Sequence, residues 1–271
     1  MSMPLAVCAT PIGNLEDVTL RVLRELAEAD LVLCEDTRRT RILLERHGIV
    51  ARLQSYHRLN EAARTTSAVE RLRRGERLAL VSDAGLPGVN DPGARLIAAA
   101  VRAGVPVTVL PGPSAVETAV VASGLVGERY QFLGYLPRRT AERRALVREL
   151  VQYPHAVVGF ESPRRLPSTL AVLAEEMPDR AGAVCRELTK RFEQIERGSL
   201  AELAERFSDV PRGEVTLVLG PVVESVVERV TDEAVAAVAE LVGAGLTRRR
   251  AVDIVAGLSG SPRNALYKAS L

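Results

Sequence analysis

Residues 82–93 read SDAGLPGVNDPG and directly follow the apolar run LALV at 78–81. An apolar run that ends in a turn rich in glycine and proline predicts a buried β-strand followed by a loop. In open α/β sheets such loops form a crevice at the carboxyl ends of the strands, where ligands bind. Asp83 and Asp91 can accept hydrogen bonds there from hydroxyl or amino groups. The segment therefore predicts an α/β enzyme that holds a small cofactor.

Short apolar runs alternate with helical patterns on both sides of this loop. This rhythm is typical of βαβ units with a parallel sheet. The expected strands cover 5–9, 31–35, 78–82 and 106–110, and the expected helices cover 19–29, 37–47, 60–74 and 92–103. Thr37 and Asn60 are the expected N-caps, and Gly104 the expected stop. We expect one doubly wound domain over 1–123.

A second α/β domain is expected over 124–222, after a turn-rich crossing at 124–137. Expected helices cover 140–151, 165–176 and 199–207, and expected strands cover 156–161, 183–187 and 214–220. Ser199 and Glu202 form a predicted capping box, and the sheet is expected to be mixed. A small helical appendage over 223–271 follows, with helices at 231–242, 247–258 and 261–271. It fits either a helix-turn-helix or a packing or dimerisation tail.

Composition limits the classes of partner. The chain has 271 residues and a net charge of +2, so net charge alone does not indicate a nucleic-acid partner, and only local arginine clusters could bind phosphates. Cys8, Cys34 and Cys185 each sit in an apolar run and are expected to be buried thiols rather than disulfides or metal ligands. No window is apolar enough to predict a membrane span or a targeting segment. We expect a cytoplasmic protein.

Two more loops are expected at the same sheet edge. TPIGN at 10–14 follows the first strand, and LPGPSA at 110–115 follows the fourth, with Ser114 at a helix start. Neither matches the usual fingerprints for nucleoside triphosphates or dinucleotides. His47, His57 and His155 lack a metal-ligand spacing. A metal-free, cofactor-dependent transfer is favoured.

An ordered set of motifs resembles the ribosomal RNA small subunit methyltransferase I family. The motifs are TPIGNLEDVTLR at 10–21, CEDTRRT at 34–40, SDAGLPGVNDPG, LPGPSA, FESPRR at 160–165, RELTKRFEQ at 186–194 and GEVTLVLG at 213–220. The resemblance implies the tetrapyrrole methylase fold, with S-adenosylmethionine in the cleft between two α/β domains. It also implies methyl transfer to the ribose 2′-oxygen of a cytidine in the decoding region of 16S rRNA.

The resemblance also implies the positions of the cofactor contacts. They are Pro11, Asp83, Ala84, Gly85, Leu86, Pro87, Leu110, Ser114, Ala115, Leu136 and Thr216, with the strand end near Glu187. The chain departs from the family pattern at Leu59 and Arg164, where a histidine is expected. Neither missing histidine can be the catalytic base of this protein.

A general base would help the transfer, because a protonated ribose hydroxyl is a poor nucleophile. The candidates are Glu187, Lys190 and Glu161, the last expected beside Arg164. Alternatively, these residues form an ion-pair network in which the charged groups only orient one another. Its expected members are Glu161, Arg164, Arg186, Glu187 and Lys190. The arginines expected to contact RNA phosphates are Arg38, Arg138, Arg139, Arg164 and Arg165.

The resemblance implies 16S rRNA or the small ribosomal subunit as substrate, and a homodimer, with no membrane or metal partner. Two other functions stay open. One is a methyltransferase of the same fold that acts on a precorrin-type tetrapyrrole. The other is a non-catalytic RNA-binding assembly factor that retains the cleft.

Overall fold

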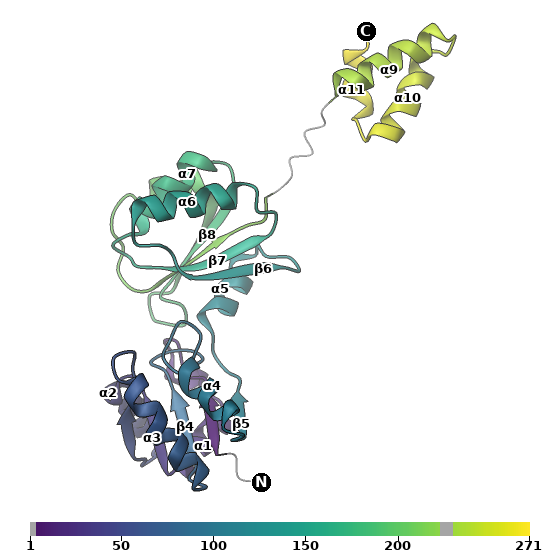
Figure 1. Ribbon diagram of the computed structural model, residues 1–271. Coiled ribbons are helices and arrows are strands. Elements are labelled where there is room, and N and C mark those ends of the chain that lie inside the picture. Colours follow the sequence, from purple (N-terminus) through teal and green to yellow (C-terminus); the bar gives the residue numbers. More distant parts are fainter. Residues whose placement is uncertain (1–3, 223–229) are drawn as a thin grey trace. The chain divides into compact units, whose positions relative to one another are not determined.

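A computed structural model describes residues 4–222 and 230–271, in two compact units, Met1–Pro221 and Val222–Leu271 (Figure 1). The first unit contains two five-stranded sheets. The α/β architecture expected from the sequence is confirmed.

The first sheet has the strand order β3-β2-β4-β1-β5 and is parallel throughout. Its strands are β1 (Leu5–Cys8), β2 (Leu31–Cys34), β3 (Leu53–Ser55), β4 (Leu78–Val81) and β5 (Val107–Leu110). The helices between them are α1 (Leu20–Glu28), α2 (Thr37–Arg46), α3 (Glu61–Arg73) and α4 (Ala94–Arg102), with a short 3-10 turn, η1 (Leu15–Asp17).

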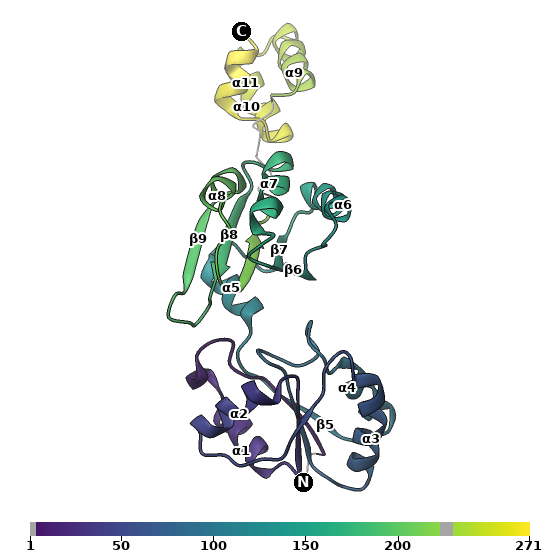
Figure 2. The ribbon, with the colours of Figure 1, turned by 90° about the vertical axis from the view of Figure 1, so that its left-hand side faces the viewer.

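Helices cover both faces of this sheet (Figure 2). Alternate residues of a strand point to opposite faces, so Leu5 and Val7 pack under α3 and α4, whereas Ala6 and Cys8 pack under α1 and α2. The expected doubly wound arrangement is confirmed. Two helix starts differ in detail: Asp36, not Thr37, caps α2 by accepting from the Arg38 N–H, and Asn60 caps α3 without a side-chain hydrogen bond.

The second sheet has the order β6-β7-β10-β8-β9 and is mixed, as expected, because only β6 and β7 are parallel. Its strands are β6 (Tyr130–Tyr135), β7 (Ala156–Glu161), β8 (Ala181–Arg186), β9 (Gln194–Ser199) and β10 (Val215–Leu219). Its helices are α5 (Ala115–Ser123), α6 (Thr140–Val151), α7 (Leu166–Glu176) and α8 (Leu200–Arg206). The predicted capping box of Ser199 and Glu202 begins α8.

The two faces of the second sheet have different cover. Helices α6, α7 and α8 enclose a large aliphatic core on one face, and α5 packs on the other with Val116 and Ala119 against Val158 and Cys185 (Figure 1). Since α5 packs on the second sheet, the chain crosses between the sheets at 111–114. The domain boundary expected after 123 stays a proposal, and this packing favours an earlier one.

A buried arginine connects several elements at one edge of the second domain, where β7 begins and β10 ends. Arg180 is 9% exposed and donates to the carbonyls of Leu150, Tyr153, His155 and Gly220 at 2.6–3.4 Å. Burial lowers the pKa of its guanidinium. Four carbonyl acceptors compensate this burial, so Arg180 joins α6, β7 and β10.

The second unit has three helices in its described part, α9 (Asp232–Gly243), α10 (Arg248–Ser259) and α11 (Arg263–Ala269). They share a small core around Val238, Val252 and Leu266. These helices agree with the expected ones, while the expected start of this region at 223 lies outside the described residues. No helix in the described ranges is long and apolar enough to cross a membrane.

Candidate active site

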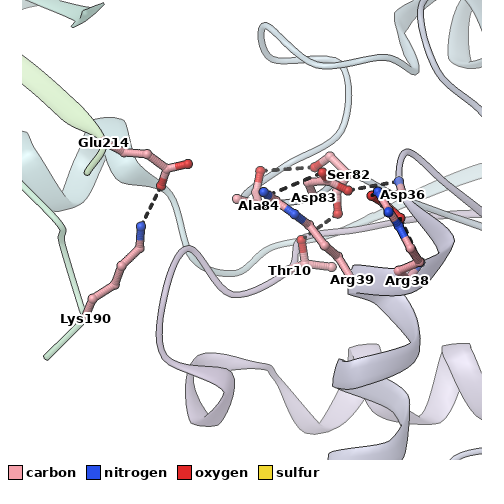
Figure 3. A network of polar contacts seen from close by, with 9 residues as sticks. All are labelled: Thr10, Asp36, Arg38, Arg39, Ser82, Asp83, Ala84, Lys190 and Glu214. Atoms are coloured by element: carbon pink, nitrogen blue, oxygen red, sulfur yellow. Dashed lines mark hydrogen bonds and ion pairs between the residues drawn. The ribbon is translucent and has the colours of Figure 1, made fainter. Parts of the chain in front are cut away.

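Three loops meet at the carboxyl edge of the first sheet, after the neighbouring strands β1, β4 and β5. Thr10 and Gly85 exchange two backbone hydrogen bonds of 2.9 Å, and the Thr10 hydroxyl donates to the Ser82 carbonyl at 3.1 Å (Figure 3). Gly85 has φ 74°, a left-handed conformation that favours glycine. The expected convergence of these loops at one edge is confirmed.

Asp83 is held in place at this edge. One carboxylate oxygen accepts from the Asp36 N–H at 3.0 Å, and the other lies 3.4 Å from the Arg39 guanidinium (Figure 3). Burial raises the pKa of Asp83, against the opposing effects of the Asp36 N–H and Arg39. The carboxylate is therefore oriented by the protein before any ligand arrives.

A cavity of about 1000 Å³ opens between these loops and the second sheet. This volume lies at the upper end of the range for small-molecule sites, roughly 300–1,000 Å³, so the cavity can hold more than one small molecule. Its lining is strongly acidic despite the net positive charge of the chain, with a single arginine, Arg39, among the lining residues. Seven lining residues carry carboxyl groups: Asp17, Glu35, Asp83, Asp91, Glu117, Glu161 and Glu214.

Two of these carboxyl groups, Glu35 and Asp91, have a raised pKa. Burial, followed by the charge of Glu35, raises the pKa of Asp91 from 3.8 to about 6. Burial, followed by the charge of Asp83, raises the pKa of Glu35. Perturbed carboxyl groups in a cleft are common at catalytic and binding sites.

The second-sheet wall of the cavity is aromatic. Of the five tyrosines and four phenylalanines in the chain, Tyr130, Phe132, Tyr135 and Phe160 line the cavity. Phe160 packs edge-on against Phe132 and Tyr135 at centroid distances of 5.1 and 5.5 Å, and Tyr135 is 60% exposed. The rings stand at 72° and 60° to one another, so the wall offers individual ring faces and edges, of which the exposed Tyr135 ring can stack with a planar ligand.

Most of the expected cofactor contacts line this cavity, namely Asp83, Ala84, Gly85, Leu86, Ser114, Ala115 and Thr216. Pro11, Pro87 and Leu110 are buried beneath the loops. The Leu136 side chain points instead into the core under α6 and α7, so only its backbone could face a ligand. Ser114 occupies the helix start, but its hydroxyl donates to Glu117 rather than capping the backbone.

Glu161 lines the cavity, but its carboxylate is already fully engaged. Its side chain is 0% exposed and accepts from the Ser162 N–H at 2.6 Å and the Thr169 hydroxyl at 2.7 Å. It also pairs with Arg165, not with Arg164 as expected. Arg165 in turn donates to the Leu136 carbonyl at 3.1 Å. This pairing matches the alternative in which the charges only orient one another.

Glu187 and Lys190 flank the lining residues Leu188 and Thr189 and form a second network with Glu214. Figure 3 shows its Lys190–Glu214 pair. Lys190 Nζ donates to Glu187 at 2.8 Å and to Glu214 at 2.9 Å, and the Glu214 N–H donates to Glu187 at 3.0 Å. The Lys190 hydrogen bond lowers the pKa of Glu187. Although burial opposes it, the hydrogen bonds to both carboxylates raise the pKa of Lys190. The lowered pKa makes the Glu187 carboxylate a weaker base, and the raised pKa keeps Lys190 protonated, so neither group is ready to accept a proton at neutral pH.

The RELTK segment also joins the two walls of the cavity. The Asn14 N–H donates to the Thr189 hydroxyl at 3.0 Å, and a Cβ on Gly13 would lie 2.5 Å from the Lys190 side chain. The TPIGN loop therefore packs directly against the second domain, and Gly13 leaves the room for this approach.

The arginines expected to bind RNA differ in availability. Arg138, Arg139 and Arg164 are exposed, and Arg38 is 84% exposed while paired with Asp36. Arg165 is held by Glu161 and is not free. Exposed Arg39, which belongs to the arginine cluster after the second strand, lines the cavity beside Asp83, and exposed Arg58 donates to the Asn90 carbonyl; neither was among the arginines expected to contact RNA.

Sequence reasoning also missed the aromatic wall, Glu35 and Ile12. Glu35 follows β2 as Asp83 follows β4, so its place after a strand end was the available signal. The described residues contain no group of His, Cys, Asp and Glu that could hold a metal ion. The three cysteines are buried thiols, and burial raises the pKa of Cys8 to about 12.

Comparison with known proteins identifies the relatives of this fold. Residues 4–204 match the family model of the Tetrapyrrole (Corrin/Porphyrin) Methylases. The chain is 39% identical over 267 residues to Ribosomal RNA small subunit methyltransferase I of Mesorhizobium japonicum, covering 97% of this chain and 90% of the relative. It is 42% identical over 271 residues to the protein of that name from Mycobacterium tuberculosis, covering 98% and 94%.

A solved structure shows the same fold at lower identity. It is the uroporphyrin-III C-methyltransferase from Thermus thermophilus complexed with S-adenyl homocysteine. The TM-score is 0.56 at 20% identity, over 80% of this chain and 96% of that one.

Proposed function

Since the chain belongs to the ribosomal RNA small subunit methyltransferase I family, we propose that it methylates the ribose 2′-oxygen of a cytidine in the decoding region of 16S rRNA. The methyl donor is S-adenosylmethionine. The observation that carries this proposal is family membership over almost the whole chain, combined with the large acidic cavity at the loops that follow β1, β4 and β5.

The residues of the cavity fit S-adenosylmethionine. The cofactor carries a sulfonium and an ammonium group, and a cavity lined by seven carboxyl groups and one arginine favours positive charge. Apolar Ile12, Val116 and Leu188 line the same cavity and suit the adenosine part. Asp83 and Gly85 are the proposed contacts from the loops of the first sheet, and Ala115 of α5 and Thr216 of β10 the proposed contacts on the side of the second sheet.

When bound, the cofactor supplies an activated methyl group on its sulfonium. The protein must then hold the ribose oxygen in line with that group at near-attack distance. The aromatic wall provides a surface on which the target base can stack, and about 1000 Å³ leaves room for a nucleoside beside the cofactor. The exposed arginines Arg38, Arg138, Arg139 and Arg164 are proposed to bind phosphates outside the acidic cavity.

The substrate is proposed to be 16S rRNA, naked or in the small subunit. That substrate puts the reaction in the cytoplasm. A homodimer is part of this proposal and is measured directly by analytical ultracentrifugation of the full chain.

The test is methyl transfer from tritiated S-adenosylmethionine to purified small subunits that lack the modification, followed by mass spectrometry of the RNA. We expect label on one cytidine ribose. In parallel, uroporphyrinogen is offered as substrate, and we expect no transfer because its carboxylates would meet an acidic cavity.

Labelled uroporphyrinogen with unlabelled RNA would overturn the proposal in favour of a tetrapyrrole methyltransferase. Calorimetry that detects no binding of S-adenosylmethionine would overturn it in favour of a non-catalytic RNA-binding factor.

A further inference from the structure

The three candidate bases expected from the sequence are engaged in ion pairs. Glu161 accepts from three donors, and Glu187 and Lys190 neutralise each other with Glu214. A carboxylate whose oxygens are occupied by a cation is a poor proton acceptor. A base for the proposed reaction should be a cavity carboxylate without a cationic partner.

Asp91 meets this condition. It lines the cavity, and the nearby Ser82 side chain partly offsets the effect of burial on its pKa. Within residues 4–222 and 230–271, no lysine, arginine or histidine nitrogen forms an ion pair with it. The carboxylate oxygens are therefore not occupied by a cation and can accept from a substrate hydroxyl.

The loop that carries Asp91 is fixed from both sides of the cavity. The Asn90 carbonyl accepts from Arg58 at 2.6 Å, and Asn90 has φ 61°. Its side chain packs on β6, where a Cβ on Gly134 would lie 2.8 Å from it. The neighbouring Asp91 is thus held next to the aromatic wall. Burial raises the pKa of Tyr135 on that wall, and the charge of Asp91 contributes to the rise.

We propose that Asp91 is the general base of the methyl transfer. This inference rests on the proposed function. The Asp91 carboxylate takes the proton of the target 2′-hydroxyl while the ribose oxygen bonds to the methyl carbon. The bond from that carbon to sulfur breaks, its electron pair stays on sulfur, and S-adenosylhomocysteine leaves. The proton on Asp91 then passes to solvent.

The surroundings of Asp91 suit this role. Glu35 after β2 and Asp83 after β4 face it with like charge, while Arg58 after β3 offsets part of that charge and Tyr135 of β6 faces it from the second sheet. The pKa of Asp91, about 6, leaves it ionised at neutral pH and more basic than an ordinary aspartate.

The test compares the wild type with Asp91→Asn at saturating S-adenosylmethionine and small subunits, in single turnovers from pH 5 to 8. In the wild type we expect the rate to fall tenfold per pH unit below about pH 6. In Asp91→Asn we expect a rate lower by about 10²- to 10⁴-fold, the usual value of a general base. We also expect the fall of the rate at acidic pH, the acidic limb of the profile, to be absent from this variant. Asp91→Glu should restore the limb, and exposed Asp209→Asn is the matched control.

Calorimetry of cofactor binding and filter binding of the subunit give readouts independent of turnover. We expect both to persist in Asp91→Asn. A wild-type rate in Asp91→Asn, or an acidic limb that survives in it, overturns the proposal while leaving the methyltransferase function standing. A wild type that does not methylate rRNA overturns the proposed function itself. If Asp91→Asn does not fold, the pH profile of Asp91→Glu is the test. A rate that falls at acidic pH supports the proposal, and a rate that does not change with pH overturns it.

Discussion

Both walls of the cavity carry carboxyl groups, but they differ in how many are paired: beside the paired Asp83, the first-domain wall has carboxyl groups without an ion pair. On the second-domain wall, Glu161 and Glu187 are each paired with a cation and backbone N–H groups. On the first-domain wall, Glu35 and Asp91 lie close to each other without an ion pair in the described structure, and burial raises the pKa of both.

This difference separates carboxyl groups that stabilise the fold from carboxyl groups that are available to act on a ligand. A compensated buried charge holds elements together, because removal of one partner leaves the other uncompensated. An uncompensated carboxyl group costs stability while it is ionised and is retained where it acts on a ligand. With Asp91 as the proposed base, the first-domain wall carries the chemistry, and the second-domain wall holds the elements of the site in place.

The largest effect is expected from Glu161→Ala. This substitution leaves Arg165 and the Thr169 hydroxyl without their partner in the core, and it should cost about 3–5 kcal/mol of unfolding free energy. Denaturant unfolding measures it, with Glu142→Ala as control, because Glu142 pairs with Arg139 at the surface. Unchanged stability with loss of methyl transfer would instead place Glu161 among the reacting groups.

Asp91→Asn should change stability in the opposite direction. Its pKa is raised from 3.8 to about 6 in the folded chain, so the unfolded chain loses this proton first and stability falls as pH rises between these values. Above about pH 6 the penalty is complete, and Asp91→Asn removes it. We expect the variant to be more stable than the wild type by roughly 1–3 kcal/mol at pH 8 and by less at pH 5.

Denaturant unfolding at the two pH values tests this gain, with Asp209→Asn as control. A loss of stability in Asp91→Asn at pH 8 would mean that Asp91 is architectural like Glu161, and the contrast between the walls would fail.

Gly85→Ala tests the geometry of the first-domain wall. The new Cβ meets only ordinary contacts, the nearest 3.8 Å away, so the cost comes from its φ of 74°, about 1–2 kcal/mol. Relief of that strain should displace the loop and weaken binding of S-adenosylmethionine by about tenfold, or 1.4 kcal/mol. Gly104→Ala is the matched control. Gly104 also has a positive φ, 69°, with open space around it, and it does not line the cavity.

Both alanine variants should lose similar stability, but only Gly85→Ala should lose cofactor affinity by calorimetry. Equal affinities in the two variants would show that the loop does not hold the cofactor.

The smallest effect concerns the exposed arginines. Replacement of Arg138 and Arg139 by glutamine should lower the slope of log binding constant against log salt for RNA by about 0.7 per lost phosphate contact. The control replaces Arg73 and Arg102, which lie at the carboxyl ends of α3 and α4 and therefore at the opposite edge of the sheet. An unchanged slope in the first pair, or an equal change in the second, would reject the phosphate assignment.

Sequence patterns predicted the buried strands and the loops well, because periodicity and turn chemistry are local. The strands they missed, β3, β6 and β9, lie at or next to sheet edges, where polar segments such as QIERGS at 194–199 need a partner on one side only. The partner of Glu161 was expected to be Arg164, but the turn before α7 brings Arg165 to it.

The contrast between the walls could not be predicted from the sequence. Asp91 and Tyr135 are far apart along the chain, and their proximity depends on the contact between Asn90 and Gly134 across two domains. Likewise, the pairing of Glu187, Lys190 and Glu214 requires β8 and β10 to lie side by side. Charge compensation is a tertiary property, which single-sequence patterns do not carry.

The most direct test of the account is the single-turnover rate of methyl transfer in Asp91→Asn and Glu187→Gln, measured side by side at pH 8 with saturating cofactor and small subunits. We predict a loss of about 10²- to 10⁴-fold for Asp91→Asn and a rate near that of the wild type for Glu187→Gln. The reverse order would contradict the assignment of chemistry to the first-domain wall.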